Sequence, residues 1–397
     1  MFYFLAEGAG DMVRTVLHSD CNSFYASVEC MKQPQLKQVP LAVGGDEEKR
    51  HGIILAKNEL AKTFGVRTAE PLWQARLKCP GLVIVPPDFE EYERISKITR
   101  AIYSDFTDRV EPFGLDEAWL DVTGDDGAEV ARKISRRIKS EVGITVSVGV
   151  SFNKIFAKLG SDYRKPDAIT VISPDNFRDI VWPLPVTDMI GVGRATGDRL
   201  AAMGIKTLGQ LANAPDERVR MLGKTGVLLK MHAGGRDSSP VRLCDERERV
   251  KSVGNSVTLP HDIVNAEEAA RVLLMLSDSV GRRLREQKLC GQCVSVGMRD
   301  SELCRFSRQR ALGEPTNRTA DIRSAAIGLV ANNYRWQKPM RSIGVTVSQL
   351  SADVGAEQVS LFVDVQKRIR SERLERVADE LNRRFGSTCI RPAAGIA

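Results

Sequence analysis

The sequence predicts a soluble α+β protein of several domains, and three observations support this fold class. The chain has 397 residues, far more than the roughly 150 residues that one domain usually contains. Hydrophobic residues make up 42% and charged residues 27%, close to the globular average and unlike a disordered or fibrous chain. Predicted strands and helices alternate in the first part of the chain, and the last part follows the order βαββαβ.

The first 174 residues predict strands and helices around a mixed sheet. Residues 14–20 have the pattern of a strand, and a helix is expected to start near Asn22 and Ser23. Further strands are predicted at 39–45, 52–56, 115–122, 143–151 and 168–172. Helices are predicted at 58–65, 88–108, 127–141 and 153–161.

Residues 186–215 have a different pattern, with two short helical runs interrupted at Gly191-Val-Gly193 and at Gly204. A Gly-x-Gly turn that opens a helix exposes backbone N–H groups, which can bind a phosphate without reading base sequence. We therefore expect a helix-hairpin-helix module in which Gly191 and Gly193 contact DNA. An ordinary helix turn is the alternative.

A charged link at 244–251 precedes the βαββαβ module. Its elements are predicted at 251–258, 266–287, 292–299, 304–312, 319–333 and 341–349. One sheet face is expected to stay open and to contact DNA through arginines on two central strands: Arg299, Arg305, Arg308 and Arg310. Residues 351–359 predict a linker and 364–385 a helix.

The basic charge of the chain is concentrated in this module. The net charge is +7; residues 241–350 hold 18 Lys and Arg against 12 Asp and Glu, whereas the first 240 residues hold 32 of each. Such a concentration is typical of a surface that follows a polyanion such as nucleic acid. A solvated basic face without a partner is the alternative.

Nothing in the sequence predicts export or a membrane span. The apolar opening MFYFLA is interrupted by Glu7 and Asp11, so residues 1–11 are interpreted as a leader. Eight scattered cysteines without an export signal predict reduced thiols and a cytoplasmic protein. Cys290 and Cys293 form a tight pair, but histidines lie too far away in sequence to complete a zinc knuckle.

Two adjacent acids in PFGLDEAWLDVTG (112–124), Asp116 and Glu117, suggest a cation site. Neighbouring carboxylates repel, and desolvating them is costly unless a cation or hydrogen-bond donors compensate. Asp20, at the end of the first predicted strand, is the candidate third carboxylate. Oxygen ligands of this kind suit two Mg²⁺ ions that activate a 3′ hydroxyl and stabilise a leaving pyrophosphate. A solvated acidic turn is the alternative.

Three separated motifs resemble one family. HSDCNSFYASVE (18–29), PFGLDEAWLDVTG (112–124) and VSVGVSFNKIFAKLGSDYRKPDAITVI (146–172) are similar, in order and spacing, to the bacterial Y-family translesion DNA polymerases, the group of DNA polymerase IV and the UmuC-type enzymes. The resemblance covers nearly the whole chain.

The resemblance implies a right-hand polymerase with a ferredoxin-like palm, a helix-hairpin-helix thumb and a βαββαβ little-finger domain. Its domains would be a palm (12–23 and 89–174), small fingers (24–88), a thumb (175–240), a linker (241–250), a little finger (251–350) and a tail (351–397).

The implied activity is template-directed addition of deoxynucleotides to a primer 3′ end by two-metal-ion phosphoryl transfer. Low fidelity, a mutator effect and translesion synthesis in DNA repair would accompany it. The implied partners are primer-template DNA, deoxynucleoside triphosphates and a sliding clamp, with the enzyme acting as a monomer.

The family's metal ligands and catalytic residues match Asp20, Asp116 and Glu117 of this chain, and the backbone carbonyl of Cys21 matches a further metal contact. Tyr25 matches the aromatic steric gate, which lies beneath the incoming sugar and excludes a 2′ hydroxyl by collision.

The resemblance also points to residues that bind the nucleotide. Lys165 matches the lysine that contacts the triphosphate, and Phe24, beside the gate, is expected to pack there. Lys62 stands where the family often has arginine and can still meet a phosphate, without a bidentate fork. Glu59 replaces the usual tyrosine, and Asn22 a second aspartate, as in UmuC-like members. Two further charged residues of these motifs are interpreted as structural: Asp121 and Lys158.

The tail contains a candidate clamp-binding peptide. Gln358, Leu361 and Phe362 resemble the short segment by which bacterial polymerases dock on the sliding clamp, with Phe362 as the principal anchor. A helix that folds back onto the protein is the alternative.

Two other functions remain open at this stage. A nucleotidyl cyclase would share the two-metal chemistry but would have no use for a basic duplex-binding module. A non-catalytic relative would bridge DNA and clamp only, and the presence of Asp20, Asp116 and Glu117 counts against it.

Overall fold

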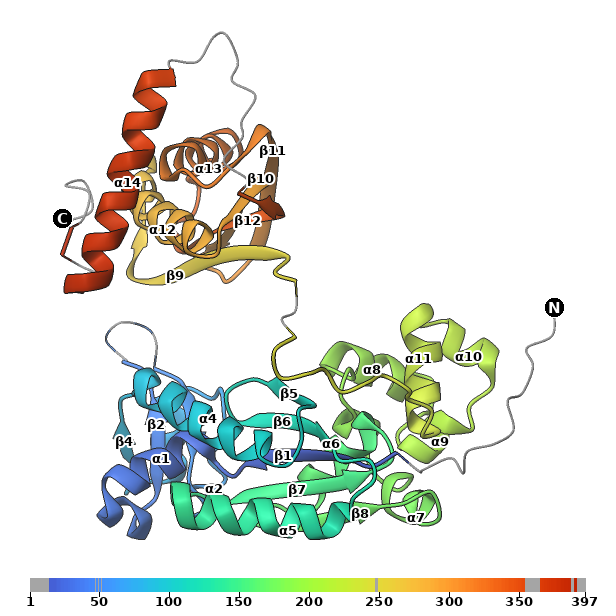
Figure 1. The fold of residues 1–397 in the computed structure, drawn as a ribbon. Coiled ribbons are helices and arrows are strands. Elements are labelled where there is room, and N and C mark those ends of the chain that lie inside the picture. Colours follow the sequence, from blue (N-terminus) through green and yellow to red (C-terminus); the bar gives the residue numbers. More distant parts are fainter. Residues whose placement is uncertain are drawn as a thin grey trace. The chain divides into compact units, whose positions relative to one another are not determined.

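The computed structural model describes residues 14–46, 48, 50, 52–246, 249–353, 365–386 and 389–390. The chain forms two compact units, Met1–Asp46 with Gly52–Glu246, and Glu47–His51 with Arg247–Ala397 (Figure 1). Within the described residues, no helix combines the length and apolar character needed to span a bilayer.

A five-stranded sheet forms the centre of the first unit. Its order is β5 (Val110–Phe113), β6 (Glu117–Asp121), β1 (Val16–Cys21), β7 (Val146–Ser151) and β8 (Ile169–Ile172). The central strand β1 pairs antiparallel with both β6 and β7, and β7 pairs parallel with β8. Every residue of β1 is buried, because the strand has neighbours at both edges and helices over both faces. The predicted mixed sheet is confirmed, and β5 is a further strand that was not predicted.

Helices cover the two faces of this sheet unequally. The core of one face is built with α1 (Phe24–Lys32), α4 (Phe89–Ser104) and α5 (Gly127–Arg137). The other face packs against α6 (Lys154–Tyr163). At Gly149 on β7, an added Cβ would lie 1.9 Å from the carbonyl oxygen of Ala157, so only glycine allows α6 to lie this close to the sheet.

A smaller sheet in the same unit has the order β3 (Ile54–Lys57), β2 (Leu41–Gly44) and β4 (Val83–Val85). It packs with η1 (Pro34–Gln38), α2 (Glu59–Thr63) and α3 (Leu72–Lys78) around small cores. The two strands expected at 39–45 and 52–56 and the helix expected at 58–65 are confirmed. Neither α3 nor β4 was foreseen, because both are short and carry little periodic pattern.

The end of the first unit is helical. It contains α7 (Phe177–Val181), η3 (Val186–Asp188), α8 (Arg194–Ala202), α9 (Leu208–Ala212), α10 (Asp216–Arg220) and α11 (Lys224–Ala233). Gly191 has φ +90°, and Gly193 is the residue before α8. The two short helical runs expected around Gly204 correspond to α8 and α9.

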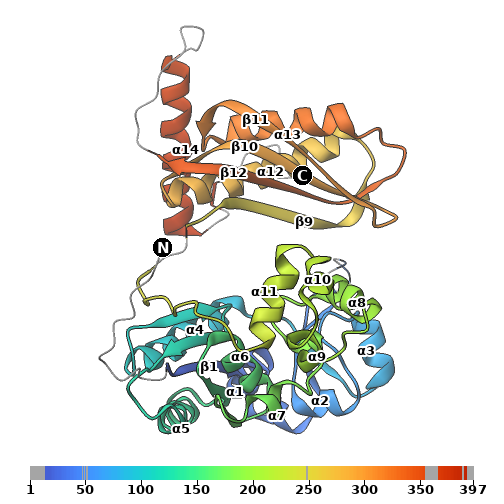
Figure 2. The same ribbon diagram turned by 90° about the vertical axis from the view of Figure 1, so that its right-hand side faces the viewer.

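The second unit has the predicted βαββαβ order (Figure 2). Its elements are β9 (Ser252–Ile263), α12 (Ala266–Glu286), β10 (Leu289–Asp300), β11 (Arg305–Thr316), α13 (Thr319–Asn333) and β12 (Met340–Ala352). All neighbouring strands are antiparallel in the order β11-β10-β12-β9. The expectation that both arginine-bearing strands are central is wrong, because β11 lies at the sheet edge.

The four predicted DNA-binding arginines do not share one face of this sheet. Arg299 pairs with Arg305 across the ladder, and both line the open face. Arg308 instead pairs with Val296, which is buried in the core beneath the helices. Because directly paired residues point to the same face, Arg308, and Arg310 two residues further along, project toward the helical side. Because side chains alternate between the two faces of a strand, the four arginines fall into two pairs on opposite faces of the sheet.

The final helix, α14 (Val365–Phe385), agrees with the helix expected at 364–385. It is attached to α12 through ion pairs of Arg285 with Glu375 (2.7 Å) and Asp379 (2.6 Å). The three side chains are largely buried, so removing Arg285 would leave two carboxylates without this counter-charge.

Candidate active site

The pairing of β1 and β6 brings the three predicted carboxylates together. Asp20 is the direct partner of Glu117 in the ladder, and the N–H of Cys21 donates to the carbonyl oxygen of Asp116 at 2.9 Å. The strand expected at 115–122 begins only at Glu117, because Gly114 with φ +78° turns the β5–β6 hairpin. Asp116 therefore lies in the hairpin turn, beside the end of β1.

One cavity of about 420 Å³ collects the residues predicted to bind metal or nucleotide. Its lining includes Asp20, Cys21, Phe24, Tyr25, Lys62, Asp116, Glu117 and Lys165. These residues come from β1, α1, α2, the β5–β6 turn, the start of β6 and the segment after α6. The cavity is thus built between the large sheet and the small one, within a single compact unit.

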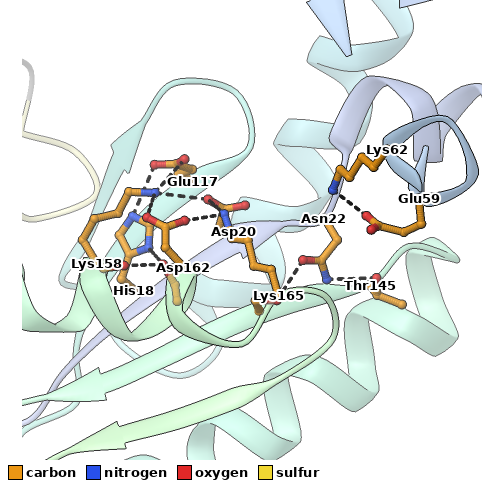
Figure 3. A network of polar contacts seen from close by, with 12 residues as sticks. His18, Asp20, Asn22, Glu59, Lys62, Glu117, Thr145, Lys158, Asp162 and Lys165 are labelled. Atoms are coloured by element: carbon orange, nitrogen blue, oxygen red, sulfur yellow. Dashed lines mark hydrogen bonds and ion pairs between the residues drawn. The ribbon is translucent and has the colours of Figure 1, made fainter. Parts of the chain in front are cut away.

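Two ammonium groups compensate the carboxylates (Figure 3). Lys165 Nζ lies 2.6 Å from Asp20 Oδ2, and Lys158 Nζ lies 3.2 Å from the same oxygen and 2.9 Å from Glu117 Oε1. Asp162 contacts both lysines, at 2.6 Å from Lys165 and 3.2 Å from Lys158. Lys158, which was predicted to be structural, lies among the acids. The i, i+4 spacing of Lys158 and Asp162 on α6 was a signal for part of this arrangement, and Lys165 follows the helix.

The crowding of negative charge shifts the protonation of the site. Burial, and then the charges of Asp20 and Glu117, raise the pKa of Asp116 to about 6. Burial also raises the pKa of Asp20. Burial lowers the pKa of Lys158, yet the net shift is upward because Asp20 and Glu117 favour the charged ammonium. Burial and the neighbouring acids therefore outweigh the lysines at Asp116 and Asp20.

Asp116→Asn is therefore expected to stabilise the metal-free protein at neutral and alkaline pH. Because the pKa of Asp116 is raised in the fold, ionising this carboxylate costs folding free energy as pH rises through about 6. The neutral amide avoids that cost, which we expect to be about 1–2 kcal/mol at pH 8 after allowance for solvent screening. Urea unfolding with a chelator present measures the difference, which should disappear below about pH 4. Equal stability at pH 8 would contradict the prediction.

The carboxylates of the cavity are ligands that suit divalent cations, although Asp20 and Glu117 are paired here with lysine ammonium groups. Among the described residues, no three His, Cys, Asp or Glu side chains form a ready group for a metal ion. Asp20 and Glu117 instead face Lys158. Three carboxylates on one cavity are nonetheless the hard oxygen donors that Mg²⁺ prefers. A cation could bind if Asp20 exchanged an ammonium group for the metal, so the residues fit this role.

The predicted gate residue is held by an aromatic stack. The ring of Tyr25 stacks on that of Tyr92, with centroids 4.3 Å apart and planes at 11°. Tyr92 is fully buried, and its hydroxyl donates to Glu29 Oε1 at 2.7 Å. Phe24 is 3% exposed and belongs to the hydrophobic core, in keeping with the packing expected of it. Tyr25 therefore has a rigid backing on the side away from the cavity.

Two departures from the family pattern have structural partners. Glu59 accepts from Lys62 Nζ at 2.5 Å and from Ser23 Oγ at 3.2 Å, so it positions Lys62 at the cavity. Asn22 donates to Thr145 Oγ1 at 3.0 Å, and its Oδ1 accepts from the hydroxyl of a buried serine on β7. Asn22 thus ties the end of β1 to β7.

The other predicted binding residues with described positions are not part of the lining of this cavity. Gly191 and Gly193 precede α8, and a Cβ at Gly193 would meet no atom within 4 Å. Arg299 and Arg305 line a hollow of about 770 Å³ on the open sheet face of the second unit. Small residues supply much of its lining: Ser252, Gly254, Ser256, Gly297, Ser342 and Gly344. The clamp residues Gln358, Leu361 and Phe362 lie outside the described residues.

Asp121, interpreted as structural, lies at the far end of β6. Its Oδ2 is 3.5 Å from Arg14 Nε, and its Oδ1 accepts from the hydroxyl of Thr123 at 2.6 Å. It does not line the cavity.

Comparisons with known proteins agree over nearly the whole chain. Residues 19–162 match the impB/mucB/samB family, residues 174–205 the helix-hairpin-helix motif of that family, and residues 250–361 its C-terminal domain. A DNA polymerase IV of Acetivibrio thermocellus is 46% identical and covers 96% of this chain and 97% of its own. DNA polymerase IV 1 of Bacillus subtilis is 35% identical, with coverages of 96% and 93%. A solved Y-family DNA polymerase chimera superposes with a TM-score of 0.76 at 26% identity, covering 85% of this chain and 99% of its own.

Proposed function

Because the chain belongs to the impB/mucB/samB family of Y-family DNA polymerases and is a DNA-directed DNA polymerase, we propose that it extends a primer by two-metal-ion phosphoryl transfer. The observation that carries the proposal is the single cavity lined by Asp20, Asp116 and Glu117 together with Tyr25 and Lys165. It unites the ligands for the metals with groups that suit a sugar and a triphosphate.

Each side chain has a role in this scheme. Asp20, Asp116 and Glu117 would hold two Mg²⁺ ions, which activate the primer 3′ hydroxyl and stabilise the leaving pyrophosphate when bound. Lys165 and Lys62 would bind the triphosphate oxygens, where a compact cation offsets negative charge. Lys165 now contacts Asp20, so it would move from that carboxylate to the phosphates.

Tyr25 would act on the sugar. Its ring cannot retreat from the cavity without displacing the buried Tyr92, so a 2′ hydroxyl beside it would collide. This supports selection of deoxynucleotides over ribonucleotides by shape.

The second unit offers a surface for duplex DNA. Its open sheet face bears small polar residues with Arg299 and Arg305 at one end, which would let a phosphate backbone approach closely. Arg308 and Arg310 lie on the opposite face of an edge strand, where they would contact DNA only beyond the sheet edge. The turn at Gly191 and Gly193 would hold the backbone elsewhere on the duplex.

We extend the proposal to the domains and their biological use. Residues 12–23 with 89–174 would be the palm, 24–88 the fingers, 175–240 the thumb and 251–350 the little finger. Low-fidelity synthesis past damaged template bases, by a monomer in the cytoplasm, follows from the family. The nucleotidyl cyclase considered from the sequence is not supported, because the full-length relatives are named as DNA polymerases.

Extension of a primed template tests this function. Intact and damaged templates are supplied with Mg²⁺ and one nucleotide at a time, and the extended primer is resolved by length. Extension that follows the template, stops with a chelator and continues opposite a damaged base supports the proposal. Removal of a mismatched primer end in the absence of nucleotides would contradict low-fidelity synthesis without proofreading.

Phe362→Ala is expected to remove stimulation by a sliding clamp. An apolar anchor in a pocket commonly supplies about 2 kcal/mol or more of a peptide's binding free energy, so processive synthesis with the clamp should fall at least about ten-fold. Primer extension without the clamp should not change, because the residues proposed to bind metal and nucleotide are unaltered. Unchanged stimulation would place the docking peptide elsewhere.

A further inference from the structure

A buried histidine lies directly beneath the proposed metal ligands. His18 is on β1, two residues before Asp20, so the alternation of the strand places both on the face covered by α6. The side chain has no solvent exposure and meets Trp119 edge-on, with ring centroids 5.0 Å apart. Figure 3 shows the ring directed at the Glu117 carboxylate. His18 has no role in the proposed polymerase mechanism.

The two ring nitrogens of His18 have different neighbours. Nδ1 lies 2.8 Å from the hydroxyl oxygen of Ser161, and Nε2 lies 3.4 Å from Glu117 Oε2. Nε2 and Oε2 are both buried, and neither has another hydrogen-bond partner among the described residues. Each is therefore the polar neighbour that the other requires.

One tautomer satisfies both atoms. A neutral imidazole carries one proton, on Nδ1 or on Nε2. A proton on Nδ1 would turn the lone pair of Nε2 toward a buried carboxylate oxygen, which would then lack a donor. With the proton on Nε2, the ring can donate to Glu117. The Ser161 hydroxyl lies 2.8 Å from the carbonyl oxygen of Lys158 as well as from Nδ1. In this tautomer its single proton turns from that carbonyl, which the α6 helix already uses as an acceptor, to Nδ1.

Close packing sets the position of Ser161. Gly149 is the partner of His18 on β7, and a Cβ at Gly149 would lie 2.5 Å from the backbone nitrogen of Ser161. The missing side chain lets α6 bring both Ser161 and Lys158 over β1. Lys158 then contacts Glu117 Oε1 at 2.9 Å, while His18 faces Oε2.

We propose that His18 is a positioning residue for Glu117. Its Nε2–H and the ammonium of Lys158 hold the two oxygens of the carboxylate, and Ser161 fixes the histidine tautomer. The orientation of Glu117 toward a divalent cation is thereby set before the cation binds. This inference rests on the proposed role of Glu117 as a metal ligand. Partners that orient a ligand from behind contribute about ten- to a hundred-fold to metal affinity.

The test measures metal-dependent nucleotide binding in a complex that cannot react. The full chain is bound to a primer-template with a dideoxy-terminated primer, and the Mg²⁺ concentration that half-saturates deoxynucleotide binding is determined. His18→Phe keeps a ring against Trp119 but loses the N–H, so the half-saturating concentration should rise about ten- to a hundred-fold. Ser161→Ala should give a smaller rise, and affinity for DNA alone should not change.

Two conservative variants separate positioning from packing. Gln at position 18 can place an amide N–H where imidazole Nε2 lies, whereas Asn reaches only the place of Nδ1. His18→Gln should therefore remain near the wild-type value and His18→Asn should resemble His18→Phe. The two amide variants also keep the inference testable if the Phe variant fails to fold. Equal Mg²⁺ dependence of the Gln and Asn variants would overturn it.

Controls distinguish this inference from the proposed function. His232→Phe changes a histidine of α11 that does not line the cavity, and it should leave the Mg²⁺ dependence unchanged. Glu117→Gln should raise the half-saturating concentration at least as much as His18→Phe. If Glu117→Gln has no effect on the Mg²⁺ dependence, the proposed metal site is wrong. If Glu117→Gln has the expected effect but a folded His18→Phe protein has the wild-type Mg²⁺ dependence, only the role of His18 is overturned.

Discussion

Asp116→Ala is expected to abolish primer extension while leaving the protein folded and able to bind DNA. The variant removes one of three carboxylates on the cavity, and loss of a group that stabilises transition-state charge through the metals should cost at least about 1000-fold in kcat. Folding should not suffer, because the pKa of Asp116 is raised by burial and by neighbouring negative charge. Single-turnover extension with saturating nucleotide measures the loss.

A matched control uses another acid of the same hairpin. Asp121 lies at the opposite end of β6 from Glu117, where it pairs with Arg14. Asp121→Asn removes a negative charge from the hairpin at a residue that does not line the cavity, so extension should stay within about three-fold of wild type. Full activity of Asp116→Ala, or an equal loss in both variants, would remove the support for the site.

The sequence allowed the regular elements and the carboxylates to be predicted for a physical reason. Period-two alternation and helical spacing are local, so β1, β7 and the βαββαβ order could be recognised without knowledge of the fold. Adjacent Asp116 and Glu117 signalled a missing cation because their repulsion needs compensation. Their meeting with Asp20 is nonlocal, and the sequence suggested it because Asp20 ends the first predicted strand; the family motifs agreed. The ladder pairing of Asp20 with Glu117 shows how the fold achieves it.

The features that were missed depend on three-dimensional pairing. The sequence pattern of β11 is that of a central strand. The sheet order shows instead that β11 is an edge strand. Likewise, the face of Arg308 is decided by its partner Val296 on another strand. Lys158 and His18 lie far apart in sequence and meet at Glu117 only because Gly149 lets α6 approach the sheet. The sequence alone gives no sign that this glycine allows the close approach of α6.

Tyr25→Ala is expected to admit ribonucleotides. Without the ring, a 2′ hydroxyl no longer collides at the floor of the sugar site, so the preference for deoxynucleotides in kcat/KM should fall about 100-fold or more. Incorporation of deoxynucleotides should fall much less, since the metal ligands and Lys165 are unaltered. Competing deoxynucleotide and ribonucleotide substrates opposite the same template base give this ratio directly.

Tyr25→Phe separates the ring from its hydroxyl. Exclusion by collision requires the rigid ring, which Tyr92 backs at 4.3 Å, so the Phe variant should keep nearly the whole preference for deoxynucleotides. If the Phe variant lost as much discrimination as the Ala variant, the hydroxyl would carry the selection by hydrogen bonding. If neither variant lost it, the sugar would be sensed by a different side chain, although the metal site itself would stand.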